Sequence, residues 1–177
     1  MIDFAVIALP KSATSWAANW LTTDASVCVH DPMVWHTPDE MADLRAINSA
    51  QSKYRGVACT GLWMVPGWVE QNVSRWVIVE RPIEEVNAGL AAMGLGPMPE
   101  HCVRQFAKMP GERISMGALF EEATAHAVWN KLLPHVPFDR ERHKLLTELM
   151  VTPAFQRIEP DPIAVKAWLK RIAEAAK

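Results

Sequence analysis

The residues best suited to chemistry lie in a short polar loop near the start of the chain, directly after an apolar run over residues 4–9. The loop supplies one ammonium group and three hydroxyls, from Lys11, Ser12, Thr14 and Ser15. The pattern is that of a strand, a loop and a helix start, an order that leaves backbone N–H groups unpaired at the positive end of a helix. Such a place favours an anion. The loop therefore predicts binding of a phosphorylated or sulfated ligand.

The loop is not a Walker A motif. The pattern G-x-x-x-x-G-K-[ST] requires glycines where this chain has Ala8 and Ala13, and it places the lysine later in the loop. Taken as residue types alone, the segment also fits an ordinary turn between a strand and a helix with a lysine on the surface.

Alternating elements follow the loop. Apolar or β-branched runs predict strands over residues 26–29, 56–62, 75–80 and 113–116. Periodic apolar residues predict helices over residues 15–21, 68–73, 83–93 and 118–133. Two more helices are predicted, one that begins at Thr37 and one within residues 97–110. Two amphipathic helices, around Leu145 and Trp168, finish the chain. This alternation predicts βαβ crossovers and a mostly parallel sheet covered on both faces. Ligands bind such sheets at the carboxyl ends of the strands.

Composition limits the classes of protein. The chain has 177 residues, of which 50% are hydrophobic and 21% charged, which predicts one domain over residues 1–177. A net charge of −2 argues against bulk binding of nucleic acid. Three dispersed cysteines without a C-x-x-C pair indicate reduced thiols and no metal site, and no apolar stretch approaches the roughly 20 residues that a bilayer requires. We expect a cytoplasmic protein that does not enter membranes.

The order of residues in the loop is more specific than their types. Pro10-Lys11-Ser12-Ala13-Thr14-Ser15-Trp16 resembles the phosphosulfate-binding loop of the sulfotransferases, P-K-S-G-T-T-W, and departs from it at Ala13 and Ser15. The resemblance implies that the loop cradles the 5′-phosphosulfate of 3′-phosphoadenylyl sulfate (PAPS). It further implies that Lys11 contacts the bridging oxygen as sulfate leaves and that Trp16 lies near the adenine.

A second segment resembles the family's 3′-phosphate signature, in which an arginine at a strand end is followed eight residues on by a serine. Arg81 takes the arginine position, Gly89 stands at the serine position, and Asn87 is the nearest polar side chain. An arginine fork suits a phosphate because it donates two parallel hydrogen bonds. The alternative is an ion pair between Arg81 and one of the neighbouring acids, Glu80, Glu84 or Glu85.

Two departures from the family pattern concern the catalytic chemistry. The family's catalytic histidine follows a strand as T-H, where this chain has Thr60-Gly61, and the C-terminal R-K-G segment of the 3′-phosphate site is absent from these 177 residues. We expect His30 and Asp31 to supply the missing base, with His36 as a second candidate, because the second strand commonly runs beside the first. A loop hydrogen bond between His30 and Asp31 is the alternative.

The resemblance covers residues 3–94 and is closest to the short sulfotransferase-like P-loop proteins predicted in phage and bacterial genomes. It implies a three-layer α/β fold of the sulfotransferase and nucleotide-kinase type, with a sheet-forming core over 3–117 and C-terminal helices over 118–177. The implied function is transfer of a sulfuryl group from PAPS to a hydroxyl or amine of a small-molecule or nucleotide-like acceptor. Two alternatives stay open, a small P-loop nucleoside or nucleotide kinase and a degenerate domain that binds a nucleotide or a partner without turnover.

Overall fold

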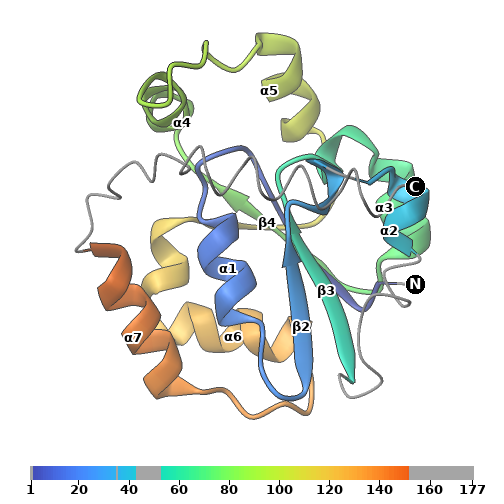
Figure 1. Cartoon of the computed structure of the whole chain (residues 1–177), viewed down its shortest axis with the longest axis vertical. Helices are drawn as coiled ribbons and strands as arrows, with labels where there is room; N and C mark the ends of the chain where they lie inside the picture. Colours follow the sequence, from blue (N-terminus) through green and yellow to red (C-terminus); the bar gives the residue numbers. More distant parts are fainter. Residues whose placement is uncertain (1, 35, 43–52, 152–177) are drawn as a thin grey trace, which may run out of the picture. The chain divides into compact units, whose positions relative to one another are not determined.

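A computed structural model describes residues 2–34, 36–42 and 53–151 of the chain (Figure 1). Contacts divide the chain into one compact unit over residues 1–147 and a second over residues 148–177. Every element described below lies in the first unit, except the last turn of its final helix. The predicted helix around Trp168 lies outside the described residues.

Five parallel strands form one sheet in the first unit, in the order β2-β3-β1-β4-β5. The strands are β1 (Phe4–Ala8), β2 (Ser26–His30), β3 (Tyr54–Cys59), β4 (Trp76–Glu80) and β5 (Glu112–Ser115). All five predicted strand regions are thus confirmed, although the third ends at Cys59 and not at residue 62. The predicted α/β class and its parallel sheet are confirmed as well.

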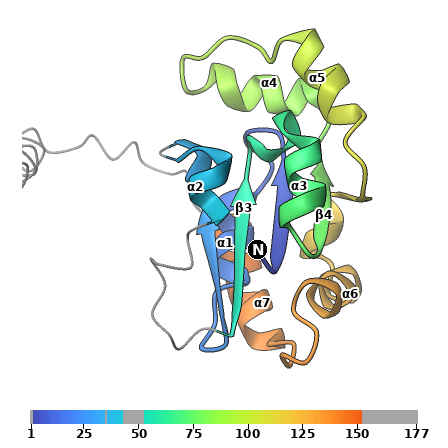
Figure 2. The ribbon, with the colours of Figure 1, turned by 90° about the vertical axis from the view of Figure 1, so that its right-hand side faces the viewer.

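Helices cover both faces of this sheet and make three layers (Figure 2). One face carries α1 (Thr14–Trp20), the 3-10 turn η4 (Gly117–Phe120), α6 (Glu122–Leu132) and α7 (Arg140–Val151). The other face carries α2 (Pro38–Ala42), the 3-10 turn η3 (Leu62–Met64), α3 (Pro66–Asn72), α4 (Ile83–Ala91) and α5 (Glu100–Ala107). A further 3-10 turn, η1 (Pro32–Val34), follows β2.

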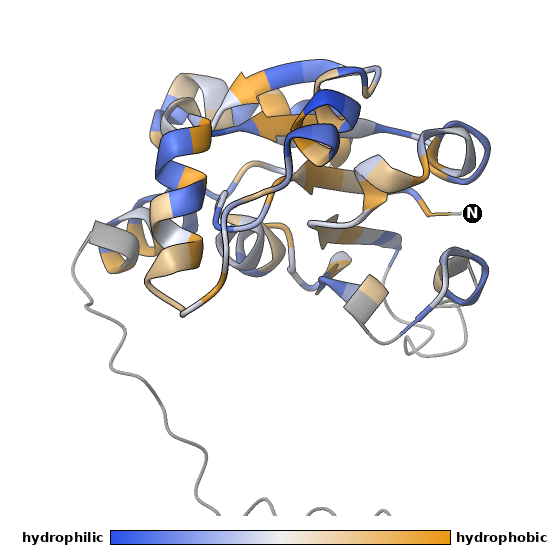
Figure 3. Cartoon of the chain, turned by 90° about the horizontal axis from the view of Figure 1, so that it is seen from above, coloured by the Kyte–Doolittle hydropathy of each residue, from blue (hydrophilic) through white to orange (hydrophobic). Residues whose placement is uncertain are grey.

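The central strands are buried on both sides, which explains their continuous apolar runs. Every residue of β1 is buried, as are Val77, Ile78 and Val79 of β4. Alternate side chains point to opposite faces, so that Val77 and Val79 join one cluster and Ile78 joins the other. Seen from above, the central strands are mostly hydrophobic and lie between helices with hydrophilic surfaces (Figure 3). The hydrophobic core of this unit therefore lies in the two layers on either side of β1 and β4.

The strand order differs from the prediction in one respect that matters for the site. β2 does not run beside β1, because β3 lies between them and pairs with both in parallel. The chain leaves the central strand β1 for the edge strand β2, returns to β3 between them, and then continues with β4 and β5 on the other side of β1. The order therefore reverses at β1, and the carboxyl end of β1 is the switch point at which ligands bind in open parallel sheets.

Local sequence signals explain the helix boundaries. Thr37 and Glu40 form the predicted capping box at the start of α2, with Glu40 Oε2 accepting from the Thr37 amide at 2.7 Å. These hydrogen bonds from Thr37 lower the pKa of Glu40. The remainder of the predicted helix, with Leu44 and Ile47, lies outside the described residues.

The final helix differs from its sequence prediction. Its leucines were predicted to face the core, yet Leu145 and Leu149 are exposed. The face of α7 that packs inward carries His143 and Leu146 instead, because the His143 ring lies beside Trp16 and Trp20 of α1 and its Nε2 lies 3.0 Å from Leu119 O of η4.

Candidate functional site

The loop between β1 and α1 lies at the switch point and has an unusual backbone. Lys11 and Ala13 both have positive φ, at 63° and 64°, a region that residues with a Cβ seldom adopt. Ala13 occupies the place where the sulfotransferase pattern has glycine, the residue that enters this region without strain. The backbone therefore follows the shape that a glycine-containing loop would take, although the sequence has alanine.

Lys11 is the exposed cation of the loop. Within the described ranges no ion-pair partner is found for its ammonium group, whereas Arg81 and Arg113 of the same sheet edge each pair with a glutamate. The aliphatic part of Lys11 lies against Gly89 of α4, where an added Cβ would come within 3.0 Å of Lys11 Cγ. The lysine stem is thus supported while its charge stays uncompensated, which makes Lys11 available to an anion.

The loop hydroxyls differ in where they point. The Ser12 side chain is buried, and its hydroxyl turns back to the Pro10 carbonyl at 3.5 Å. Thr14 Oγ1 and Ser15 Oγ instead lie 3.1 Å and 3.0 Å from His30 Nε2, at the end of β2. The predicted meeting of His30 with the loop is therefore observed, although the reason given for it was wrong. The two meet because α1 crosses from β1 over β3 to β2, which carries its first turn to His30.

Asp31 favours one tautomer of the neutral histidine ring. Its Oδ2 lies 3.1 Å from His30 Nε2, the same nitrogen that faces the two hydroxyls. An ionised carboxylate only accepts hydrogen bonds, so Nε2 carries the hydrogen in the neutral ring and Nδ1 keeps the lone pair. Nδ1 is therefore the nitrogen of His30 that can take up a proton.

Asp31 also joins two strand ends, which no local pattern in the sequence indicates. Its Oδ1 accepts from the Thr60 amide at 2.6 Å, and its own amide donates to Ala58 O at 2.9 Å. Asp31 holds these contacts with a positive φ of 42°. A bound, strained aspartate at a strand end is what a fixed site requires, and Thr60 takes part through its backbone alone.

Arg81 and Asn87, from the segment that resembles the 3′-phosphate signature, form hydrogen bonds within the protein. Arg81 donates from NH1 to Lys11 O at 2.5 Å and from Nε to Glu85 Oε2 at 2.9 Å. Asn87 Oδ1 accepts from the Met98 amide at 2.9 Å. The ion pair with Glu85 is the alternative that the sequence left open for Arg81. The bond to Lys11 O was not foreseen, because it joins residues 70 positions apart.

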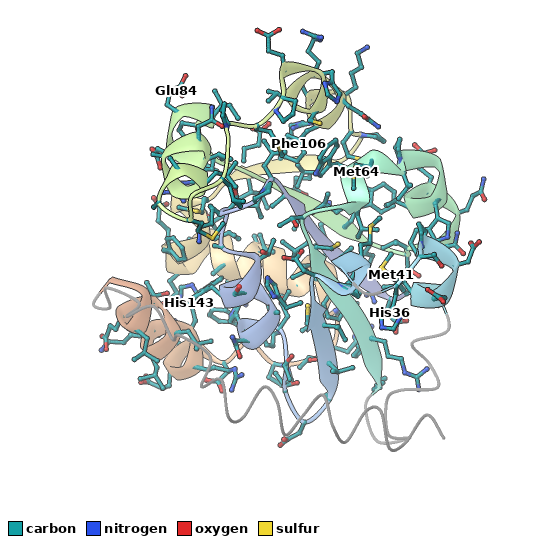
Figure 4. All side chains as sticks on the ribbon, turned by 45° about the horizontal axis from the view of Figure 1, so that its top comes forward. His36, Met41, Met64, Glu84, Phe106 and His143 are labelled. Atoms are coloured by element: carbon teal, nitrogen blue, oxygen red, sulfur yellow. The ribbon has the colours of Figure 1, made fainter. Side chains whose placement is uncertain are left out.

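Trp16 is part of the core in this structure. Its side chain is 5% exposed and is surrounded by three rings, those of Trp20, Phe120 and His143, with centroids 5.0–5.7 Å away. Figure 4 shows His143 where α7 meets α1. Contact between Trp16 and an adenine would require this cluster to open.

Other candidate groups lie outside the site. His36 lies near Met41 of α2, on the face of the sheet opposite His143 (Figure 4). Burial raises the pKa of Cys59, which works against a reactive thiolate. Glu80, at the end of β4, pairs with Arg113 at 2.5 Å. In the part of the chain that the structure describes, no group of three His, Cys, Asp or Glu side chains is arranged to hold a metal ion.

Comparisons with known proteins assign no family to this arrangement. No protein-family model, no curated protein and no solved structure matches the chain. No helix among the described residues is long and apolar enough to cross a membrane. The function must therefore be argued from the site itself.

Proposed function

We propose that the chain is a sulfotransferase-like P-loop enzyme, which transfers a sulfuryl group from PAPS to a hydroxyl or amine of a small-molecule or nucleotide-like acceptor. One observation carries the proposal. At the switch point of a parallel sheet, a loop whose lysine has no ion-pair partner in the described part of the chain meets a histidine whose tautomer is fixed by a carboxylate. The resemblance of residues 10–16 to the phosphosulfate loop supports the choice of donor.

The residues present fit a phosphosulfate. Lys11 contributes an exposed positive charge, and Ser15 contributes an exposed hydroxyl. The His30 side chain is 42% exposed, so it can meet a second substrate from solvent. A cation and hydroxyls beside exposed backbone are suited to the charge that develops on a leaving phosphate oxygen.

The proposed step is a direct displacement at sulfur. The acceptor oxygen or nitrogen forms a bond to sulfur, and the bond between sulfur and the bridging phosphate oxygen breaks, with its electron pair passing to the 5′-phosphate. Lys11 stabilises that oxygen. His30 Nδ1 takes the acceptor proton and later releases it to solvent, and Asp31 stabilises the imidazolium while it exists. The products are a sulfate ester or sulfamate and PAP, the adenosine 3′,5′-bisphosphate that PAPS leaves behind.

The kinase alternative would use the same loop with a magnesium nucleotide. Mg²⁺ in phosphoryl transfer is held by carboxylates and substrate phosphates. The acid at the end of β4, Glu80, is neutralised by Arg113, and Asp31 is bound to Thr60 and His30. These contacts favour sulfuryl transfer, which needs no metal ion, over phosphoryl transfer.

A thermal-shift panel of the full chain tests the proposal. The ligands are PAP, PAPS, ATP and GTP, each with and without Mg²⁺. We expect PAP and PAPS to raise the melting temperature equally well without the metal, since a ligand that binds only the folded state stabilises it. Stabilisation by ATP or GTP only with Mg²⁺ would support the kinase reading. No shift with any nucleotide would contradict both enzyme proposals and would support the domain that binds a partner without turnover.

A further inference from the structure

The segment that resembles the 3′-phosphate signature acts on the loop. Arg81 NH1 binds the carbonyl of Lys11, and the missing side chain at Gly89 leaves room for the stem of the same lysine. Arg81 lies in the turn that precedes α4 and Gly89 lies near the end of α4, and both contacts converge on Lys11. The segment from Arg81 to Gly89 therefore sets the position of Lys11 from its backbone side and from its side-chain side.

The charge of Arg81 is already balanced. Its Nε lies 2.9 Å from Glu85 Oε2, one turn along α4, and Arg81 is the less exposed partner of the pair, at 25% against 53%. A dianionic phosphate placed at Arg81 would approach the Glu85 carboxylate as well, and like charges at short range repel. Glu84 adds a second exposed acid on the same turn. Arg81 in this setting offers little net attraction to a phosphate.

The two polar positions farther along α4 also differ from the family pattern or make contacts within the protein. Gly89 has no hydroxyl where the family pattern has serine, and Asn87 Oδ1 holds the Met98 amide. The R-K-G segment that would complete a 3′-phosphate site is absent from these 177 residues. Together these departures leave the assigned positions with an arginine paired to Glu85, a glycine in place of the serine, and an asparagine whose oxygen holds a backbone amide.

We propose that this chain takes adenosine 5′-phosphosulfate (APS) as sulfuryl donor as readily as PAPS, because the site does not bind the 3′-phosphate. The proposal rests on the proposed function and concerns the donor class of that same site. The reaction is otherwise unchanged. The bond between sulfur and the bridging oxygen breaks, the acceptor bonds to sulfur, the acceptor proton leaves through His30, and AMP takes the place of PAP as product.

Titration calorimetry of the full chain with the two products tests this. PAP and AMP differ only by the 3′-phosphate. We expect their dissociation constants to agree within about threefold, whereas a 3′-phosphate held by a charged hydrogen bond would favour PAP by about 10- to 150-fold. PAP that binds more than threefold tighter overturns the inference and leaves the proposed function standing. Binding of neither nucleotide overturns both.

Arg81→Gln separates positioning from phosphate binding. Loss of the bond to Lys11 O should weaken PAP and AMP by the same factor, since both depend on the position of Lys11. Arg104→Gln is the matched control, because Arg104 makes the same kind of i, i+4 ion pair with Glu100 on α5 and should leave both affinities unchanged. A loss confined to PAP in Arg81→Gln would show that Arg81 does bind the 3′-phosphate, and would overturn the inference.

Discussion

The β1–α1 loop and helix α4 meet at the same edge of the sheet, yet they differ in what their polar groups contact. In the loop, Lys11 has no ion-pair partner among the described residues, and Thr14 and Ser15 face His30. Arg81, in the turn before α4, and Asn87, on α4, form hydrogen bonds with neighbouring groups of the protein. The first region has donors available to a ligand, whereas the second holds the first in place.

The difference shows that a motif can keep its residue types while its role changes. An arginine at a strand end binds either a phosphate or a backbone carbonyl with the same fork. Which of the two it binds depends on whether a carboxylate lies close enough to balance its charge. In this chain the Glu85 carboxylate pairs with Arg81. Variants that act on one region and spare the other can therefore break or sharpen the comparison.

Lys11→Ala should have the largest effect. The variant loses both a charged contact to the nucleotide and the group that stabilises the leaving oxygen, so we expect kcat/KM for transfer to fall by about 10³-fold or more. The free energy of unfolding should change by less than about 0.5 kcal/mol, because the side chain is exposed. Calorimetry with AMP and a denaturant melt measure the two quantities. Unchanged nucleotide affinity would remove Lys11 from the site.

His30→Ala should act on turnover without acting on nucleotide affinity. Loss of a general base typically costs about 10²–10⁴-fold in rate. His101→Ala, an exposed histidine on α5, is the control and should keep the parent rate. The initial rate of sulfate transfer and the dissociation constant of AMP are the readouts. A parent-like rate in His30→Ala would leave the contact with Ser15 as a structural hydrogen bond only.

The sequence predicted the framework better than the site. Apolar runs and cap residues identified all five strand regions, because burial and capping leave local patterns. The predicted pairing of β2 with β1 was wrong, because strand order depends on long-range packing that no local pattern records. The meeting of His30 with the loop was foreseen, but its tautomer was not, because it depends on the geometry of Asp31. Likewise, the contact between Gly89 and Lys11 is visible only in three dimensions.

Gly89→Ala tests the supporting role of α4. The new Cβ would lie 3.0 Å and 3.1 Å from Lys11 Cγ and Cβ, so the lysine stem must shift by a few tenths of an ångström. We expect nucleotide affinity and turnover to fall by a few fold each, which is small because a lysine stem adapts. Gly67→Ala, in α3, has nothing within 4 Å of its added Cβ and should change neither quantity. If the two variants have the same nucleotide affinity and turnover, α4 does not support the position of Lys11.

Ala13→Gly should have the smallest effect, and its sign is the informative part. Ala13 holds a φ of 64°, where a residue with a Cβ is strained by roughly 1–2 kcal/mol, and glycine removes that strain at a cost of about 0.5–1 kcal/mol in unfolded-chain entropy. The net expectation is a gain of about 0.5–1 kcal/mol in the free energy of unfolding. Ala91→Gly, at the end of α4, is the matched control and should lose a similar amount, because glycine disfavours a helix. Urea melts of both variants give the two signs. If Ala13→Gly also loses stability, the loop does not hold the left-handed conformation at Ala13 that places Lys11 and Thr14 on either side of it. The arrangement in which the β1–α1 loop meets α4 through Lys11 would then be contradicted as well.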